Sequence, residues 1–421
     1  MIASPYPLEL TLGMRYYATD ERGIGGRLRR SAEDFAVEEC STPPSGSGPY
    51  LIVRLTQRDW ELQHAVKEIA KRLGISHRRI GWAGTKDRRA VTTQLISIYG
   101  VSPEDLARVQ LKEIRLEPIG TAGDALSLGQ LAGNRFAIWI RGCTTESLAE
   151  RVGTVTESAR HGLPNYVGYQ RFGVIRPVTH LVGERILAED YEGAVLAYVG
   201  MPFPAESEEI RSAREDYSAT LDAAQALRRF PRHLSYERAM LHHLAVHPAD
   251  HAGALRVLPP KLLSIFVSAF QSYLFNCGLS DRMAAGCALD EPVPGDLLLF
   301  PDGKTDIVTA RAQRAAALQV RRGRACIAIA LPGAAPGGDR ATSPGVRCLL
   351  DEKGLTPDSF RRAAAFVGTA FAGTARSVAL ATEIETRTEG DAVFLDFTLG
   401  PGQYATTVCR EYMKADPLCM V

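Results

Sequence analysis

The stretch GWAGTKDRRAVTTQ, residues 81–94, is the most informative part of the chain. Glycines flank an aromatic residue at its start, and a lone carboxylate, Asp87, follows between Lys86 and the pair Arg88–Arg89. Nearby cations favour the ionised form of a carboxylate, and an ionised carboxylate with limited solvation can act as a covalent nucleophile. The same cations could hold RNA phosphates. The alternative is a solvated turn in which Asp87 only pairs with a neighbour.

The residues around this stretch predict a mixed α/β unit over 31–141. Apolar residues at helical spacing predict a helix over 62–73, with Asp59 as its N-cap and Gly74 as its stop. Alternating or β-rich segments predict strands at 34–39, 50–55, 79–83, 91–98 and 135–141.

The texture of the chain changes after residue 173. Helical patterns at 223–229 and 260–277 precede a Pro/Gly-rich loop at 332–345, and a strand pattern returns at 392–399. This order suggests one domain inserted into another. We expect an α/β (α+β) domain with a mixed or antiparallel sheet from 1–165 and 372–421, and a mainly helical insertion from 166–371.

Composition is that of an ordinary soluble globular protein, with 45% hydrophobic and 23% charged residues in 421. The net charge is only +1, so any nucleic-acid surface must be a local patch. Such a patch is present in residues 67–89, which contain eight Lys or Arg and two acidic residues, a local charge of +6. A solvated helix face and turn would give the same pattern.

The chain shows no sign of export or membrane insertion. Its eight cysteines form no C-x-x-C pair, the first residues do not resemble a signal peptide, and no stretch approaches about 18 uncharged apolar residues. We therefore expect a cytoplasmic protein with reduced thiols and no membrane partner.

Three histidines at four-residue steps, His243, His247 and His251, could imitate a metal site on a continuous helix. Pro248 is expected to interrupt that helix, and no cysteine or H-E-x-x-H motif completes a ligand set. No metal site is predicted.

Residues 81–94 resemble the TruD family of pseudouridine synthases, whose hallmark is a Gly-x-Lys-Asp-x-x-Ala-Val-Thr stretch. Further matches follow in the family's order, and they resemble its longer archaeal members. They are D-F-x-V-x-E at 34–39, GNRF at 133–136, NYVGYQRFG at 165–173, the helix at 266–276, and GQYATT with Arg410–Glu411 near the end.

This resemblance implies a role for particular residues. Asp87 falls on the family's catalytic aspartate, and Phe136 on the aromatic residue that stacks on the target base. Asn134 is expected either to orient the pocket or to form a hydrogen bond near Asp87. Without the resemblance Phe136 would be taken as a core residue. Phe35 is expected to pack under the site and Glu39 to pair with a cation. The remaining supporting or RNA-contacting candidates are Arg29 or Arg30 as the family's basic residue, Lys86, Arg88, Arg89, Tyr166, Gln170 and Arg171.

The implied reaction is the isomerisation of a uridine in tRNA, uridine 13 by resemblance, with Asp87 as nucleophile. It breaks the N1–C1′ bond and rejoins the base through C5, so no cofactor is expected, and we expect a monomer. One alternative is a non-catalytic RNA-binding protein that uses the same basic cleft. Another is a glycosidic-bond hydrolase, which would usually need a second carboxylate.

Overall fold

The structure is a computed structural model that describes residues 1–44, 46–335 and 343–421. It divides into two compact units. Unit 1 contains Met1–Ala18 and Gly162–Leu380, and unit 2 contains Thr19–His161 and Ala381–Val421. The predicted α/β class with a mixed sheet is confirmed. Part of the predicted loop at 332–345, residues 336–342, lies outside the described residues.

The first 18 residues belong to unit 1, whereas the sequence analysis placed them with 19–165. Within these residues the short strand β1 pairs with β2, and both strands belong to unit 1. The functional division into 1–165 with 372–421 and an inserted 166–371 stays a prediction.

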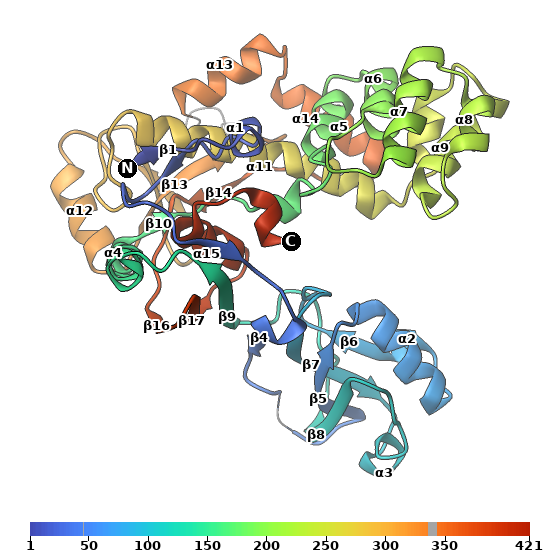
Figure 1. The fold of residues 1–421 in the computed structure, drawn as a ribbon, viewed down its shortest axis with the longest axis horizontal. Helices are drawn as coiled ribbons and strands as arrows, with labels where there is room; N and C mark the ends of the chain where they lie inside the picture. The colour runs from blue at the N-terminus through green and yellow to red at the C-terminus, as the bar shows by residue number, and fades with distance from the viewer. Residues whose placement is uncertain (45, 336–342) are drawn as a thin grey trace. The chain divides into compact units, whose positions relative to one another are not determined.

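Unit 2 is built around one large sheet (Figure 1). Its strands are β3 (Gly25–Arg27), β4 (Phe35–Cys40), β5 (Tyr50–Arg58), β6 (Ile80–Trp82), β7 (Val91–Tyr99), β8 (Ile114–Ala122), β9 (Gly133–Cys143), β16 (Ile384–Glu389) and β17 (Ala392–Leu399). Its helices are η1 (Ala32–Asp34), α2 (Leu62–Leu73), η2 (His77–Arg79), α3 (Pro103–Leu106), α4 (Leu148–His161), α15 (Ala405–Met413) and η6 (Pro417–Met420).

The strand order in this sheet is β16-β17-β9-β4-β7-β5-β8, with β3 paired to β9 and β6 paired to β7. Strands β4 and β7 run parallel, and the other pairs between described strands of the sheet are antiparallel. The parallel pair brings the first half of β4, Ala36 to Glu38, beside the start of β7, which directly follows the Asp87 loop.

Helix α2 covers one face of the sheet at β5 and β7, as Figure 1 shows. Its apolar residues recur every three or four positions, and Val66 and Ile69 are buried against Val53 and Ile96. The predicted bounds and the stop at Gly74 are confirmed, because Gly74 adopts the left-handed conformation (φ 66°) that glycine tolerates.

The N-cap of α2 is Glu61, so the prediction of Asp59 was wrong. Glu61 accepts hydrogen bonds from the backbone N–H groups of Gln63 and His64, 3.0 and 2.9 Å away. Asp59 has a left-handed backbone (φ 57°), and its N–H donates to the Ala90 carbonyl oxygen instead.

Unit 1 is mainly helical, with small sheets. Its helices are α1 (Pro7–Thr11), η3 (Tyr169–Arg171), α5 (Thr179–Leu187), α6 (Tyr191–Val195), η4 (Leu196–Gly200), α7 (Glu208–Thr220), α8 (Ala223–Arg229), α9 (Ser235–Val246), α10 (His251–Arg256), α11 (Pro260–Ala284), α12 (Gln313–Arg321), α13 (Pro344–Glu352) and α14 (Pro357–Val367). Its strands are β1 (Ile2–Ala3), β2 (Tyr16–Tyr17), β10 (Leu163–Pro164), β11 (Leu297–Leu299), β12 (Thr305–Ile307), β13 (Cys326–Leu331), β14 (Thr374–Ser377) and β15 (Ala379–Leu380).

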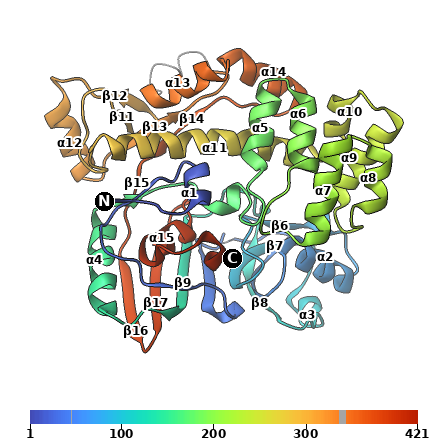
Figure 2. The same ribbon diagram turned by 45° about the horizontal axis from the view of Figure 1, so that its top comes forward.

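Helix α11 runs lengthwise through unit 1, with α5–α10 toward one end and the β11–β14 sheet toward the other (Figure 2). It is long and apolar enough to cross a membrane by length and composition, and 67% of its most apolar window is buried inside the protein. Residues 262–280 carry no charge, so the expectation that no stretch of this kind exists was wrong. A core helix passes the same test, and the burial of α11 fits a core helix.

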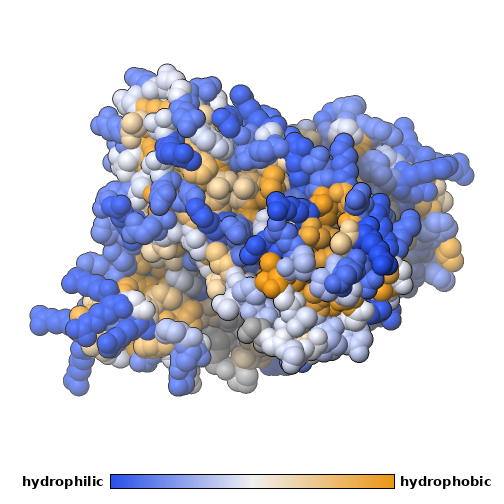
Figure 3. All heavy atoms as spheres, turned by 90° about the horizontal axis from the view of Figure 1, so that it is seen from below, coloured by the Kyte–Doolittle hydropathy of each residue, from blue (hydrophilic) through white to orange (hydrophobic). Residues whose placement is uncertain are grey.

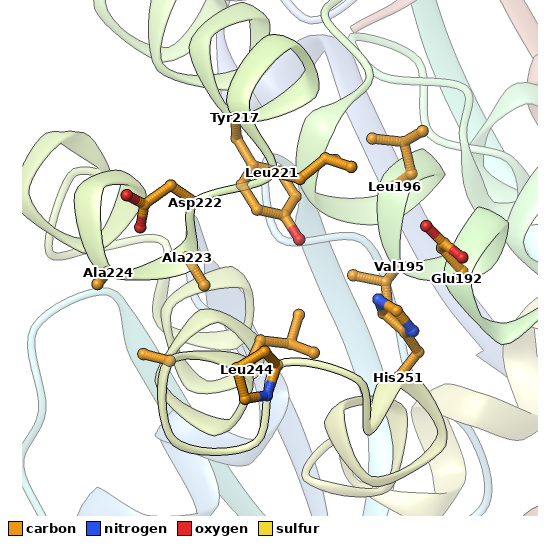
Figure 4. A pocket seen from close by; sticks show the side chains of 12 residues that line it. Glu192, Val195, Leu196, Tyr217, Leu221, Asp222, Ala223, Ala224, Leu244 and His251 are labelled. Carbon is orange, nitrogen blue, oxygen red and sulfur yellow. The ribbon is translucent and has the colours of Figure 1, made fainter.

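Polar and charged side chains cover most of the face seen in Figure 3, with smaller apolar areas between them. A separate pocket of about 340 Å³ lies among α6–α10 of unit 1 (Figure 4), where the Tyr217 side chain points toward the space beside Leu244 and His251. No predicted site residue lines this pocket.

Candidate active site

The loop that carries Asp87 joins β6 to β7. These strands pair as far as Trp82 opposite Ile96, and the chain between them extends beyond the paired segment. The side-chain amide of Gln94 donates to the Gly84 carbonyl oxygen at 3.1 Å and holds the base of the loop. A Cβ atom at Gly81 would lie 2.4 Å from the Leu126 carbonyl oxygen, which explains glycine at this position.

Asp87 lies beside Arg29. Their side chains form an ion pair of 3.3 Å, in which Arg29 is 6% exposed and Asp87 is 41% exposed. The Arg29 guanidinium stacks 3.9 Å above the ring centroid of Phe35 and donates to the Met420 carbonyl oxygen at 2.8 Å. Of the two candidate arginines, Arg29 is therefore the one that contacts Asp87, and it leaves the carboxylate open to solvent.

Lys86 forms its ion pair with Glu39. Its ammonium group lies 2.9 Å from the Glu39 carboxylate, and the two side chains are only 4% and 1% exposed. Ser41 donates a second hydrogen bond to Glu39 at 3.0 Å. This buried pair anchors the loop residue next to Asp87 to the end of β4.

Three phenylalanines form an aromatic cluster on the sheet face below the loop. Phe136 lies 5.6 Å from Phe397 in a stacked arrangement and 6.3 Å from Phe35 edge to face. The strand register places Phe136 directly opposite Phe397 on β17. Phe136 is 7% exposed, so most of its ring packs against protein.

Asn134 lies two residues before Phe136, on the same face of β9, and is directly opposite Glu39 on β4. Its side-chain oxygen is buried and has no hydrogen-bond partner in the described part of the chain. The same holds for the side-chain oxygen of Gln94, whose amide nitrogen holds the loop. Because buried polar atoms are nearly always hydrogen bonded, these acceptors are suited to N–H donors of a ligand.

Arg88 and Arg89 are exposed, and neither makes an ion pair with a described residue. Arg30 is also exposed, and its guanidinium lies near Gly142 rather than near Asp87. These cations remain available to phosphate groups.

Tyr166, Gln170 and Arg171 belong to unit 1. Tyr166 is fully buried, and its hydroxyl lies 2.8 Å from that of Ser280. Gln170 is exposed on the short helix η3, and the buried Nε of Arg171 lacks a hydrogen-bond partner among the described residues. Their support of the Asp87 site stays a prediction.

Within the described residues, no group of three or more His, Cys, Asp or Glu side chains could hold a metal ion. The predicted interruption at Pro248 is confirmed, since α9 ends at Val246 and α10 begins at His251. His243 contacts Asp250 at 2.8 Å. All eight cysteines are free thiols.

The sequence analysis missed two contributors to the site. Phe397 was recognised only as part of a strand, and its alternation with Leu395 and Leu399 was the available signal for an inward-facing ring. Met420 contributes a backbone oxygen to Arg29, and no sequence signal marks such a contact.

Comparison with known proteins identifies the class. Residues 11–412 match the model of the family "tRNA pseudouridine synthase D (TruD)". The chain is 40% identical to a "probable tRNA pseudouridine synthase D" of Methanosarcina mazei, over 98% of this chain and 99% of that protein. A relative with the same description from Halobacterium salinarum is 39% identical over 99% of both chains.

A solved structure gives the same answer. The crystal structure of a TruD from Methanosarcina mazei matches with a TM-score of 0.84 and 37% identity, over 99% of this chain and 100% of that one. The fold is thus that of a tRNA pseudouridine synthase, a class of isomerases. The chain belongs to the TruD family.

Proposed function

We propose that this protein converts uridine 13 of tRNA to pseudouridine, with Asp87 as the nucleophile. The observation that carries the proposal is the position of Asp87 on the β6–β7 loop. Its carboxylate is partly exposed and forms an ion pair with the buried Arg29. Membership of the TruD family supports the substrate class.

The chemistry requires an ionised carboxylate at the sugar of an extruded nucleotide. Asp87 either attacks C1′ or removes a proton from the sugar, after which the base separates from C1′ at N1 and rejoins through C5. The C5 proton is lost and N1 gains one, so the reaction balances without an oxidant or reductant. Arg29 pairs with this carboxylate at 3.3 Å and holds it in place for either route.

The target uridine must leave its stack, which costs a few kcal/mol. Phe136, which is 7% exposed, offers the small accessible part of its side chain to the base and sits in a cluster that fixes its position. The unpartnered side-chain oxygen of Asn134 is suited to the N3–H group of uracil. Arg88 and Arg89 bind the flanking phosphates, and we expect a cytoplasmic protein that works as a monomer.

Asp87→Asn tests the proposal, because it keeps the shape of the side chain but removes the charge. Pseudouridine formation at position 13 should fall by about 10⁴-fold or more, while tRNA affinity stays within about twofold of wild type. The readout is site-specific mapping of pseudouridine in a tRNA transcript. Asp124→Asn, at an exposed acid of the same unit, is the matched control and should remain fully active.

Other results would change the assignment. Full activity of Asp87→Asn would remove the nucleophile. A wild-type protein that binds tRNA and never modifies it would be an RNA-binding protein, and release of free uracil would indicate a hydrolase. A transcript with cytidine at position 13 that still gains pseudouridine would contradict the site of action.

A further inference from the structure

A shallow depression adjoins the Asp87 loop at the start of helix α2. Its volume is about 360 Å³, and its walls are Asp59, Trp60, Glu61, His64 and Arg88. Arg88 directly follows Asp87 in the chain, so the depression lies next to the candidate active site. None of the roles proposed above uses its aromatic residues.

The wall formed by Trp60 is held in place before any ligand arrives. The indole N–H donates to the Lys112 carbonyl oxygen at 3.2 Å, and the ring packs 5.0 Å from that of His64. The Trp60 carbonyl oxygen accepts from the side-chain amide of Gln57 at 3.2 Å. Glu61 caps α2 with both carboxylate oxygens, which orders the backbone on the other side of Trp60.

Asp59 ties the depression to the catalytic loop. Its N–H donates to the Ala90 carbonyl oxygen at 3.1 Å, two residues after Arg88. Its side chain is exposed and has no hydrogen bond or ion pair with any described residue. The depression therefore combines a fixed aromatic face, a free carboxylate and a free guanidinium.

We propose that this depression is a stacking subsite for the base of a nucleotide adjacent to the target uridine. The base stacks on Trp60, its N–H donors face Asp59, and its phosphate lies toward Arg88. The inference rests on the proposed function, since it requires an RNA substrate. Two carboxylates would repel a phosphate at the inner wall, so the base rather than the backbone must face them.

Such a subsite would hold the strand while the target base is extruded. Stacking of one base on an aromatic side chain contributes about 1–3 kcal/mol and tolerates all four bases. A base with N–H donors gains a further contact from Asp59, so this subsite also favours some neighbours over others.

Trp60→Ala is the first test. We expect the KM and the dissociation constant for the tRNA transcript to rise by about 5- to 150-fold, with kcat changed much less. Trp60→Phe, which keeps an aromatic face but loses the bond to Lys112, should recover most of the affinity. Tyr99→Ala is the matched control, because Tyr99 is an exposed aromatic residue at the far end of β7.

A second measurement separates stacking from a structural role. Two abasic transcripts are compared, one without the base on the 5′ side of the target and one without the base on its 3′ side. One of the two should bind wild type and Trp60→Ala with equal affinity, because the base that stacks on Trp60 is missing from it. The other should still bind Trp60→Ala more weakly than wild type. If the loss caused by Trp60→Ala is the same on intact and on abasic RNA at both sides, the residue is structural and the subsite does not exist. Unchanged affinity of Trp60→Ala for intact RNA would also overturn the inference.

Two safeguards keep the result decisive. If Trp60→Ala lowers the melting temperature, Trp60→Leu replaces it, since leucine keeps apolar bulk without an aromatic face. Dissociation constants do not depend on turnover. A wild-type protein that forms no pseudouridine would therefore contradict the proposed function. The affinities for intact and abasic RNA would still show whether the subsite exists.

Discussion

At the scale of single residues, the buried pair of Lys86 and Glu39 determines how the Asp87 loop is held. Lys86→Met removes one partner and leaves a carboxylate that is 1% exposed without its counter-charge. Breaking a buried ion pair in this way typically costs about 3–5 kcal/mol. We therefore expect a marked fall in the thermal stability of unit 2, measured by calorimetry, together with a loss of activity.

The double variant Lys86→Met/Glu39→Gln provides the comparison. It removes both charges, and the glutamine can still accept the hydrogen bond from Ser41. Because a neutral pair leaves no buried charge unpaired, most of the lost stability should return. A double variant no more stable than Lys86→Met would show that the unpaired Glu39 charge is not the cause of the loss.

At the scale of elements, the short helix η6 supports the site from the other end of the chain. The Leu28 N–H donates to the Cys419 carbonyl oxygen at 2.9 Å, and Arg29 donates to that of Met420 at 2.8 Å. Both acceptors lie outside the residues that match the family model, which end at 412. Ending the chain after Asp416 should lower kcat by about tenfold, because Arg29 loses its acceptor while its charge remains.

Deletion of η6 also removes the buried side chain of Met420, so stability falls as well. A double-mutant cycle with Arg29→Ala isolates the effect on the site. If η6 acts by positioning Arg29, its deletion should not lower kcat further in the Arg29→Ala background. An equal loss of kcat in both backgrounds would mean that η6 only stabilises the fold. The control is Leu418→Ala, at an exposed side chain of η6, which should change neither kcat nor stability.

The elements that the sequence predicted well are those with strong local patterns. Alternation located β17, and helical spacing located α2 and α8 within the observed bounds. Strand β8 was missed because it lies at the edge of the sheet and most of its residues are exposed, which leaves little alternation. The N-cap of α2 was misplaced because two acids lie two positions apart and only the backbone angle of Asp59 decides between them.

At the scale of the whole molecule, the site depends on contacts that a single sequence does not reveal. The carboxylate loop could be recognised by its motif, but Arg29 meets the Met420 carbonyl oxygen across 391 positions of the chain. Arg29 could not be preferred over Arg30 by sequence, because both precede the same motif. In the structure Arg29, which has a left-handed backbone (φ 55°), is the one whose side chain pairs with Asp87.

The net charge of +1 has a consequence for how tRNA binding depends on salt concentration. Since the protein as a whole does not attract RNA, the salt dependence of tRNA binding must come from local cations. Arg88→Ala/Arg89→Ala should reduce the slope of log Kd against log salt by about 1–2, close to one per lost phosphate contact. Affinity should fall mainly at low salt, as fluorescence anisotropy with a labelled transcript would show.

The control for this prediction changes the net charge by the same amount at arginines that are already paired. Arg108 lies 3.6 Å from Asp105, and Arg115 pairs with Glu117 at 2.5 Å. Arg108→Ala/Arg115→Ala should leave the slope unchanged, because their charges are locally neutralised. If both double variants lowered the slope equally, the total charge rather than the Asp87 loop would govern RNA binding, and Arg88 and Arg89 would lose their assigned role.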